Sequence, residues 1–267
     1  MIVTPRRLIP LATALLLVCS CTPDGSAELS SAYAVGLSVV HPDYSGDHLT
    51  PWSDLQQAAA TSPVDLDPLP APPGTHPLTF TPGDATVPPT AATALLRTAY
   101  RSGTGRKPLE RRKVVDFIAG LDDIVTTSGV TPGSYGLELV VDLDHPRPVT
   151  DLTALVPGAS RVLFPQMGSA ELPLSWSSEN CAATPGCTGT DPVTQFRGWL
   201  KGLTPDQRDT LSGKPFDLPT MEKTAREGLV AGLMYDRIDP ASALKLLRDP
   251  LIKAAYVAGV VQLKAVP

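Results

Sequence analysis

The sequence predicts an α+β or α/β fold in which two β-α-β units form a sheet, helices pack on one face, and a proline-rich arm comes first. Two observations carry this prediction. Strand and helix patterns alternate from residue 133 to the C-terminus, and a strongly amphipathic helix precedes them. The chain has 267 residues, of which 42% are hydrophobic, so it can build an adequate core. Its net charge of −5 argues against nucleic acid as an electrostatic partner.

The region before this helix carries shorter patterns. Residues 32–40 are predicted to form a strand, because large apolar residues alternate with small ones. Short helices are expected over 51–60 and 90–101. Residues 63–89 contain nine prolines in 27 positions, which favours extended structure with one strand at 78–81. The apolar residues in this arm indicate that it wraps on the domain, and a free spacer is the alternative.

The amphipathic helix is predicted over residues 108–127. Its apolar residues recur at intervals of three and four, which places them on one stripe. Pro108 suits the first turn, and Gly129 suits a C-terminal stop. The stripe consists of Val114, Phe117, Ile118, Leu121, Ile124 and Val125.

The first β-α-β unit spans residues 135–164. Alternation over 135–144 predicts a strand with one apolar face. A short helix over 149–156 and a strand over 160–164 complete the unit. The predicted apolar face carries Leu137, Leu139, Val141 and Leu143, and the opposite face carries Glu138, Val140, Asp142 and Asp144.

The second β-α-β unit lies at the C-terminus, and several helices precede it. Residues 228–257 resemble a strand-helix-strand pattern of exported sensory domains of anti-sigma-type regulators and of propeptide-like ferredoxin folds, which supports the fold class. Its elements are a strand over 228–238, a helix over 240–248 and a strand over 252–263. Capping residues followed by proline predict the preceding helices over 191–203 and 204–211, and a further helix is predicted over 218–227.

The N-terminus carries an export signal. Arg6 and Arg7 precede an apolar run, residues 8–18, that is too short to cross a bilayer and suits a signal peptide. The following Val18-Cys19-Ser20-Cys21 resembles the lipobox of bacterial lipoproteins. This resemblance implies that the chain is cut before Cys21 and that the Cys21 sulfur is lipidated. An ordinary cleaved signal with incidental cysteines is the alternative.

The lipobox predicts where the protein is located and how its chain is divided. We expect a lipid-anchored protein on the extracytoplasmic face of the cell membrane. The predicted divisions are a signal peptide (1–20), a lipidated tether (21–31), an N-terminal region that packs on the main domain (32–132) and an α/β sandwich domain (133–267).

Processing would leave one cysteine pair in the folded domain. Cys181 and Cys187 enclose five residues with a Pro-Gly turn, so their sulfurs can meet. Outside the cytoplasm the expected product is a disulfide.

A basic cluster surrounds the start of the amphipathic helix. Residues 97–113 hold seven basic side chains in 17 positions. Cations are unfavourable at a helix N-terminus, and a bound anion would remove the conflict. We therefore predict an anion site, for lipid headgroups or an anionic cell-wall polymer, with a solvated surface paired to acids elsewhere as the alternative. Its candidate residues are Arg106, Lys107, Arg111, Arg112 and Lys113.

Two acidic groupings are weaker candidates for chemistry. His41, Asp43, Asp47 and His48 lie within eight residues and could bind a metal, although a polar turn explains them as well. Glu138, Asp142 and Asp144 share one predicted strand face. Asp142 and Asp144 would lie about 7 Å apart, a separation suited to paired acid and base carboxylates, and a solvent-facing strand edge is the alternative.

These patterns favour a non-catalytic, membrane-tethered binding or sensory lipoprotein. Its expected partners are the membrane, through the N-terminal lipid, and an anionic envelope ligand or an envelope protein. No cofactor and no catalytic residue is predicted. The alternative is an envelope hydrolase that uses carboxylates or a metal near residues 41–48.

Overall fold

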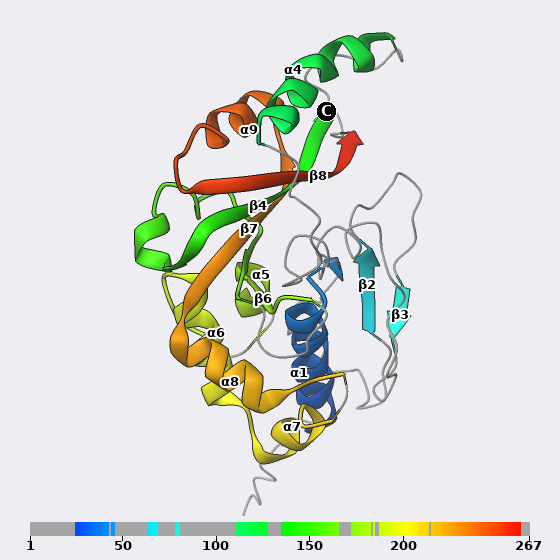
Figure 1. The fold of residues 1–267 in the computed structure, drawn as a ribbon. Coiled ribbons are helices and arrows are strands. Elements are labelled where there is room, and N and C mark those ends of the chain that lie inside the picture. Colours follow the sequence, from blue (N-terminus) through cyan, green and yellow to red (C-terminus); the bar gives the residue numbers. More distant parts are fainter. Residues whose placement is uncertain are drawn as a thin grey trace, which may run out of the picture.

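A computed structural model describes residues 25–42, 44–45, 64–68, 78–80, 111–127, 135–165, 172–182, 184, 187–213 and 215–262. Within these residues no helix is long and apolar enough to cross a membrane. Figure 1 shows the arrangement of the elements.

The central feature is a five-stranded antiparallel sheet, which confirms the predicted α+β class. The strands lie in the order β6-β5-β7-β4-β8. Their bounds are β4 (Tyr135–Pro148), β5 (Arg161–Leu163), β6 (Ser175–Ser177), β7 (Leu229–Ile238) and β8 (Ile252–Gln262).

The two predicted β-α-β units exist, but they are interleaved. Strands β4 and β5 both run antiparallel to β7, so they are parallel to each other with β7 between them. By the same reasoning β7 and β8 are parallel and enclose β4. Each unit is therefore split by a strand of the other, which is the β-α-β-β-α-β plan called ferredoxin-like. The short helices η1 (Val149–Leu152) and α9 (Pro240–Leu246) make the two crossovers.

An insertion separates the second and third strands of this plan. It carries β6 and four helices. Two of these helices begin with the capping residues expected from the sequence, Asp191 and Thr204, and a third begins at a cap that was not predicted, Asp217. Asp191 and Asp217 each accept a hydrogen bond from the backbone N–H three residues on, and Thr204 forms a reciprocal capping box with Gln207. The helices are α5 (Ser178–Ala182), α6 (Pro192–Gly202), α7 (Pro205–Thr210) and α8 (Leu218–Glu227).

Residues 32–40 form a helix, so the strand predicted there is wrong. The segment forms the second half of helix α1 (Gly25–Val40), and every residue from Ala32 to Val39 is buried. A helix buried on all sides needs no polar face, so its sequence lacks the helical period and imitates a strand. Gly36 shows why small residues recur: a β-carbon there would lie 2.6 Å from Leu211 Cδ2 and 2.9 Å from Phe216 Cε1.

A second, small sheet comes from the proline-rich region. It consists of β1 (Tyr44–Ser45), β2 (Val64–Pro68) and β3 (Leu78–Phe80), in antiparallel order β1-β2-β3. Strand β3 confirms the strand predicted over 78–81, whereas β2 was not predicted. Because Pro63 precedes β2 and Pro68 ends it, the sequence suggests irregular structure there.

Other expectations for the N-terminal half lie outside the described residues. These are the signal peptide, most of the arm, and the helices over 51–60 and 90–101. Helix α1 begins at Gly25, inside the predicted tether. The division into domains stays a prediction.

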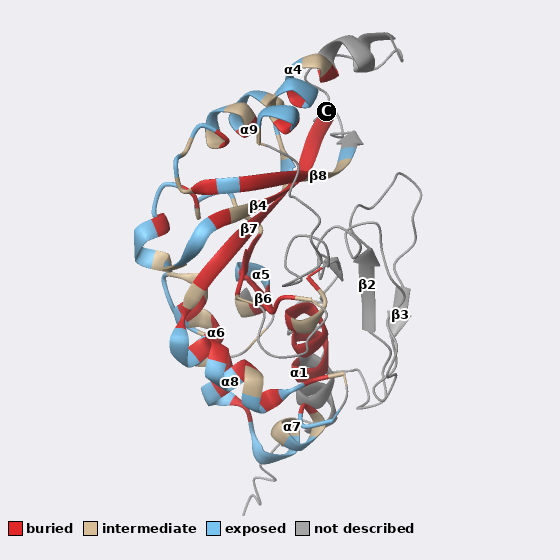
Figure 2. Cartoon of the chain, in the orientation of Figure 1, coloured by how far each residue is buried: buried red, intermediate tan, exposed pale blue. Residues whose placement is uncertain are grey.

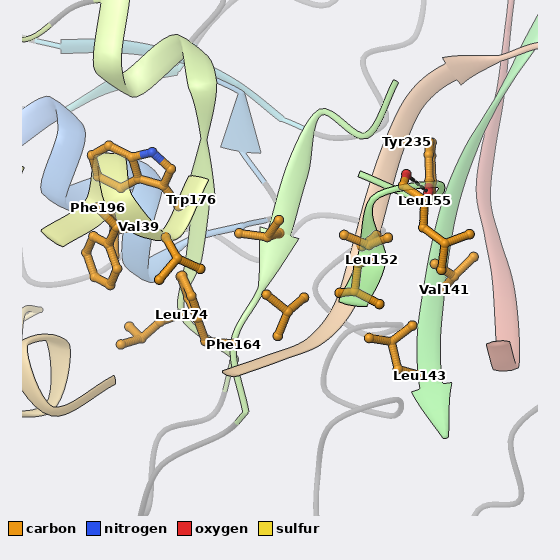
Figure 3. Packing of buried hydrophobic residues seen from close by; sticks show 14 of the residues in the cluster. Val39, Val141, Leu143, Leu152, Leu155, Phe164, Leu174, Trp176, Phe196 and Tyr235 are labelled. Atoms are coloured by element: carbon orange, nitrogen blue, oxygen red, sulfur yellow. Dashed lines mark hydrogen bonds between the residues drawn. The ribbon is translucent and has the colours of Figure 1, made fainter. Parts of the chain in front are cut away.

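The main core joins one face of the sheet to the helices (Figure 2). Leu137, Leu139 and Val141 of β4 belong to it, as the alternation predicts. Near β6 an aromatic cluster fills the core, where Trp176 and Phe164 each lie 5.2 Å from Phe196 between ring centroids (Figure 3).

The opposite face of the sheet carries a smaller buried cluster, to which none of the described helices contributes. The helices therefore pack on one face, as expected. This second cluster consists of Val140, Leu163, Met234, Ala254 and Tyr256.

Candidate functional site

Helix α4 (Arg111–Thr127) carries the described part of the predicted anion site. It packs on β8 and α9 at one end of the molecule (Figure 1). Val114, Ile118 and Leu121 are buried, which confirms the predicted stripe at these positions. Phe117 departs from the prediction, because its side chain is 43% exposed.

Arg111 has a structural role that the sequence did not predict. Its Nη1 donates hydrogen bonds to the carbonyl oxygens of Asp249 and Ile252, each at 3.2 Å. Asp249 lies in the turn between α9 and β8, and Ile252 is the first residue of β8, so the half-buried guanidinium holds the start of α4 to this corner of the sheet. Part of the donor capacity of Arg111 is therefore used within the protein.

Arg112 and Lys113 are both exposed at the first turn of α4. No carboxylate of the described residues pairs with either of them. The first turn of α4 also contains no acidic residue, so two positive charges lie at the positive end of the helix dipole. An anion bound at this position would be stabilised by both side chains and by the dipole. Arg106 and Lys107 lie outside the described residues.

The predicted acidic strand face is only partly formed. Glu138 and Asp142 lie on the second face of the sheet on either side of Val140, and Glu138 is buried. Burial raises the pKa of Asp142 to about 6, although the nearby Lys253 cation acts in the opposite direction.

Asp144 does not join Glu138 and Asp142. The pairing of β4 with β8 shifts register between Asp142 and Leu143, so the alternation on which the prediction depends ends there. Arg147 instead donates hydrogen bonds to the Asp144 carboxylate at 2.8 and 3.0 Å. These hydrogen bonds lower the pKa of Asp144 to about 2.

Of the four residues predicted as a candidate metal site, only His41 lies among the described residues. This residue follows the C-terminal end of α1, where its backbone N–H donates to Leu37 O at 2.8 Å, rather than following a strand. Asp43, Asp47 and His48 lie outside the described residues. Among the residues that are described, no group of three or more His, Cys, Asp or Glu side chains could hold a metal ion.

The predicted disulfide between Cys181 and Cys187 is present, with its Cα atoms 5.2 Å apart. Both cysteines are partly buried against the main core. The disulfide closes the loop between α5 and α6.

A buried polar cluster at the end of α1 was missed by sequence reasoning. Arg161 of β5 is only 2% exposed, and its Nη1 donates to Ser38 Oγ at 3.1 Å. Ser175 Oγ donates to Ser38 O at 3.0 Å, and Ser38 Oγ donates to Asn180 Oδ1 at 3.0 Å. The last turn of α1 contains no basic residue, so Arg161 supplies the positive charge that the helix C-terminus favours. The one available sequence signal was a charged residue at the start of an otherwise apolar strand.

No protein-family model, curated protein or solved structure matches this chain. A function for this chain is therefore inferred from its own residues.

Proposed function

We propose that the protein is a lipid-anchored extracytoplasmic binding module, without catalytic activity, that takes an anionic envelope ligand at the start of α4. The observation that carries the binding site is the pair of exposed cations, Arg112 and Lys113, at a helix N-terminus without acidic neighbours in its first turn. Arg106 and Lys107, a few residues before the helix in the sequence, add to this positive charge, and Glu110 opposes it.

The anchor is argued from the lipobox and supported by the disulfide. Cys21 occupies the position at which bacterial lipoproteins carry their lipid. The Cys181–Cys187 bond is of the kind that persists in oxidising compartments outside the cytoplasm, which agrees with export.

Metabolic labelling with a fatty-acid probe tests the anchor. We expect Cys21→Ala to abolish labelling. Cys19→Ala is the matched control, because Cys19 lies on the removed side of the cleavage point. If Cys21→Ala is labelled as strongly as the natural protein, the anchor proposal is wrong.

Retention on a negatively charged polymer tests the binding site. The probe is immobilised polyphosphate, used with the non-lipidated mature domain at two salt concentrations. We expect binding that weakens with salt and that falls in Arg112→Ala/Lys113→Ala. Lys223→Ala/Arg226→Ala is the matched control, because it removes two exposed cations from α8. Equal binding by the two double variants would exclude the α4 site.

An envelope hydrolase remains the second candidate, and one observation favours it. Asp142 is a partly buried carboxylic acid whose pKa of about 6 suits proton transfer near neutral pH. Metal analysis of the mature protein distinguishes the two proposals: stoichiometric metal that is lost on His48→Ala would favour the hydrolase. Loss of a measured hydrolytic activity on Asp142→Asn would favour it as well.

A further inference from the structure

Helix α1 connects the anchor to one particular end of the domain. In its middle turns, the Tyr33 ring packs edge-on against Phe216 at 5.3 Å, and Gly36 lies against Leu211. Leu211 and Phe216 follow α7, so the middle of α1 lies beside the end of α7. The C-terminal end of α1 lies beside strands β5 and β6, where Ser38 bonds to Arg161 and Ser175.

The basic start of α4 lies at the other end of the molecule. Figure 1 shows α1 running from α7 towards β6, with α4 and α9 beyond the far end of the sheet. Strand β7 connects the two ends, because it leaves α8 and leads into α9. Helix α4 packs on α9 and β8, and Arg111 at its start bonds to Asp249 and to Ile252 at the beginning of β8.

The chain between the lipid and α1 is short. Four peptide steps lead from Cys21 to Gly25, the first residue of α1, and they cover at most about 14 Å. The helical residues from Gly25 to Tyr33 add about 12 Å. The α7 end therefore lies within about 26 Å of the acylated residue, whereas α4 lies at the opposite end of the molecule (Figure 1).

We infer that the anchored protein stands with its α7 end towards the bilayer and presents the start of α4 away from it. The ligand of α4 is then an anionic polymer of the envelope, and not the headgroups of the membrane that carries the anchor. This inference rests on the proposed lipidation of Cys21 and on the proposed anion site.

The charges at the α7 end are consistent with attachment through the lipid alone, without attraction between basic side chains and the bilayer. The described charged residues of α7 and the first part of α8 include more acids than bases, so these residues provide no net cationic attraction for anionic lipid. At the other end, attraction between Arg112 or Lys113 and headgroups decays over about 8–10 Å in physiological salt, far less than the length of the domain. The charged residues at the α7 end are Asp206, Arg208, Asp209, Asp217, Glu222 and Lys223.

Energy transfer from single labelled cysteines to lipid tests this orientation. The full lipoprotein is reconstituted into vesicles of phosphatidylglycerol and phosphatidylcholine with acceptor-labelled headgroups. Donors are placed at Asp209→Cys on α7 and at Ala119→Cys on α4, which are both exposed positions. Cys181 and Cys187 are disulfide-bonded, and an acylated Cys21 has no free thiol, so each engineered cysteine is labelled alone.

We expect energy transfer from Asp209→Cys to be several-fold greater than from Ala119→Cys. Equal transfer from both positions means that the domain lies on its side, and greater transfer from Ala119→Cys means that it is inverted; either result overturns the inference. Flotation with the vesicles is measured in the same samples. Protein that floats but shows equal transfer refutes only the orientation, whereas protein that does not float refutes the lipid anchor and the orientation with it.

Discussion

Replacing Gly36 by alanine tests whether α1 is a helix buried within the core. In an exposed helix this change is stabilising, because alanine has the higher helix propensity. In this protein the new β-carbon would lie 2.6 Å from Leu211 Cδ2 and 2.9 Å from Phe216 Cε1. Leu211 is fully buried and Phe216 is 5% exposed, so neither side chain has open space into which to move.

The two effects have opposite signs and can be compared. The propensity gain is about 0.5–1 kcal/mol, and overpacking a well-packed core costs about 1–3 kcal/mol. The difference between the two effects has a central value of about 1 kcal/mol, so we expect Gly36→Ala to lower the free energy of unfolding by about 1 kcal/mol. Gly120→Ala in α4 is the matched control, because no atom lies within 4 Å of its β-carbon position. It should raise the free energy of unfolding by about 0.5–1 kcal/mol.

Urea unfolding of the mature, non-lipidated domain measures both variants. The result that supports the reasoning is a lower midpoint for Gly36→Ala and a higher midpoint for Gly120→Ala, at unchanged slope. If Gly36→Ala is as stable as the natural protein, α1 does not pack as described.

Three further predictions concern the turn, the loop and the sheet face. Arg111→Ala should destabilise the domain by about 1–2 kcal/mol, because two carbonyl oxygens lose a charged donor; Arg111→Lys should restore only part of this in urea unfolding. Replacing Cys181 and Cys187 by alanine should cost about 2–2.5 kcal/mol through the entropy of the unfolded chain, and reductant should lower the melting temperature of the natural protein but not of the double variant. Burial raises the pKa of Asp142 from 3.8 to about 6, so ionisation of this residue lowers the free energy of unfolding as the pH rises from 4 to 6. The full loss is present above about pH 6, and no loss remains as the pH falls towards 4. Asp142→Asn should therefore add about 1 kcal/mol at pH 8, after allowance for partial solvent exposure, and flatten the stability profile between pH 4 and 6; a profile like that of the natural protein would contradict the assignment.

Local signals in the sequence were sufficient to predict most of the helices and strands in the second half of the chain. Helices α6, α7 and α9 begin where Asp191, Thr204 and Asp239 predicted them, because a cap followed by proline acts within one turn. The alternation in β4 identified its buried face for the same reason.

Features that depend on contacts between distant residues could not be predicted from local signals. Which strands are neighbours depends on contacts between residues far apart in the chain, so the interleaving of the two units was not predicted. Helix α1 was predicted as a strand because burial on all sides removes the helical period. The partners of Arg111 and Arg161 lie more than 100 residues away from them in sequence, so neither bonding pattern left a local signal.

The most direct test of the proposed function is the ratio of dissociation constants for soluble polyphosphate between the two double variants. Each cation near an anionic surface contributes about 1 kcal/mol. Arg112→Ala/Lys113→Ala should therefore bind about 30-fold more weakly than the natural domain at low salt. Lys223→Ala/Arg226→Ala should bind almost as tightly as the natural domain. A ratio near one between the two variants would contradict a binding site at the start of α4.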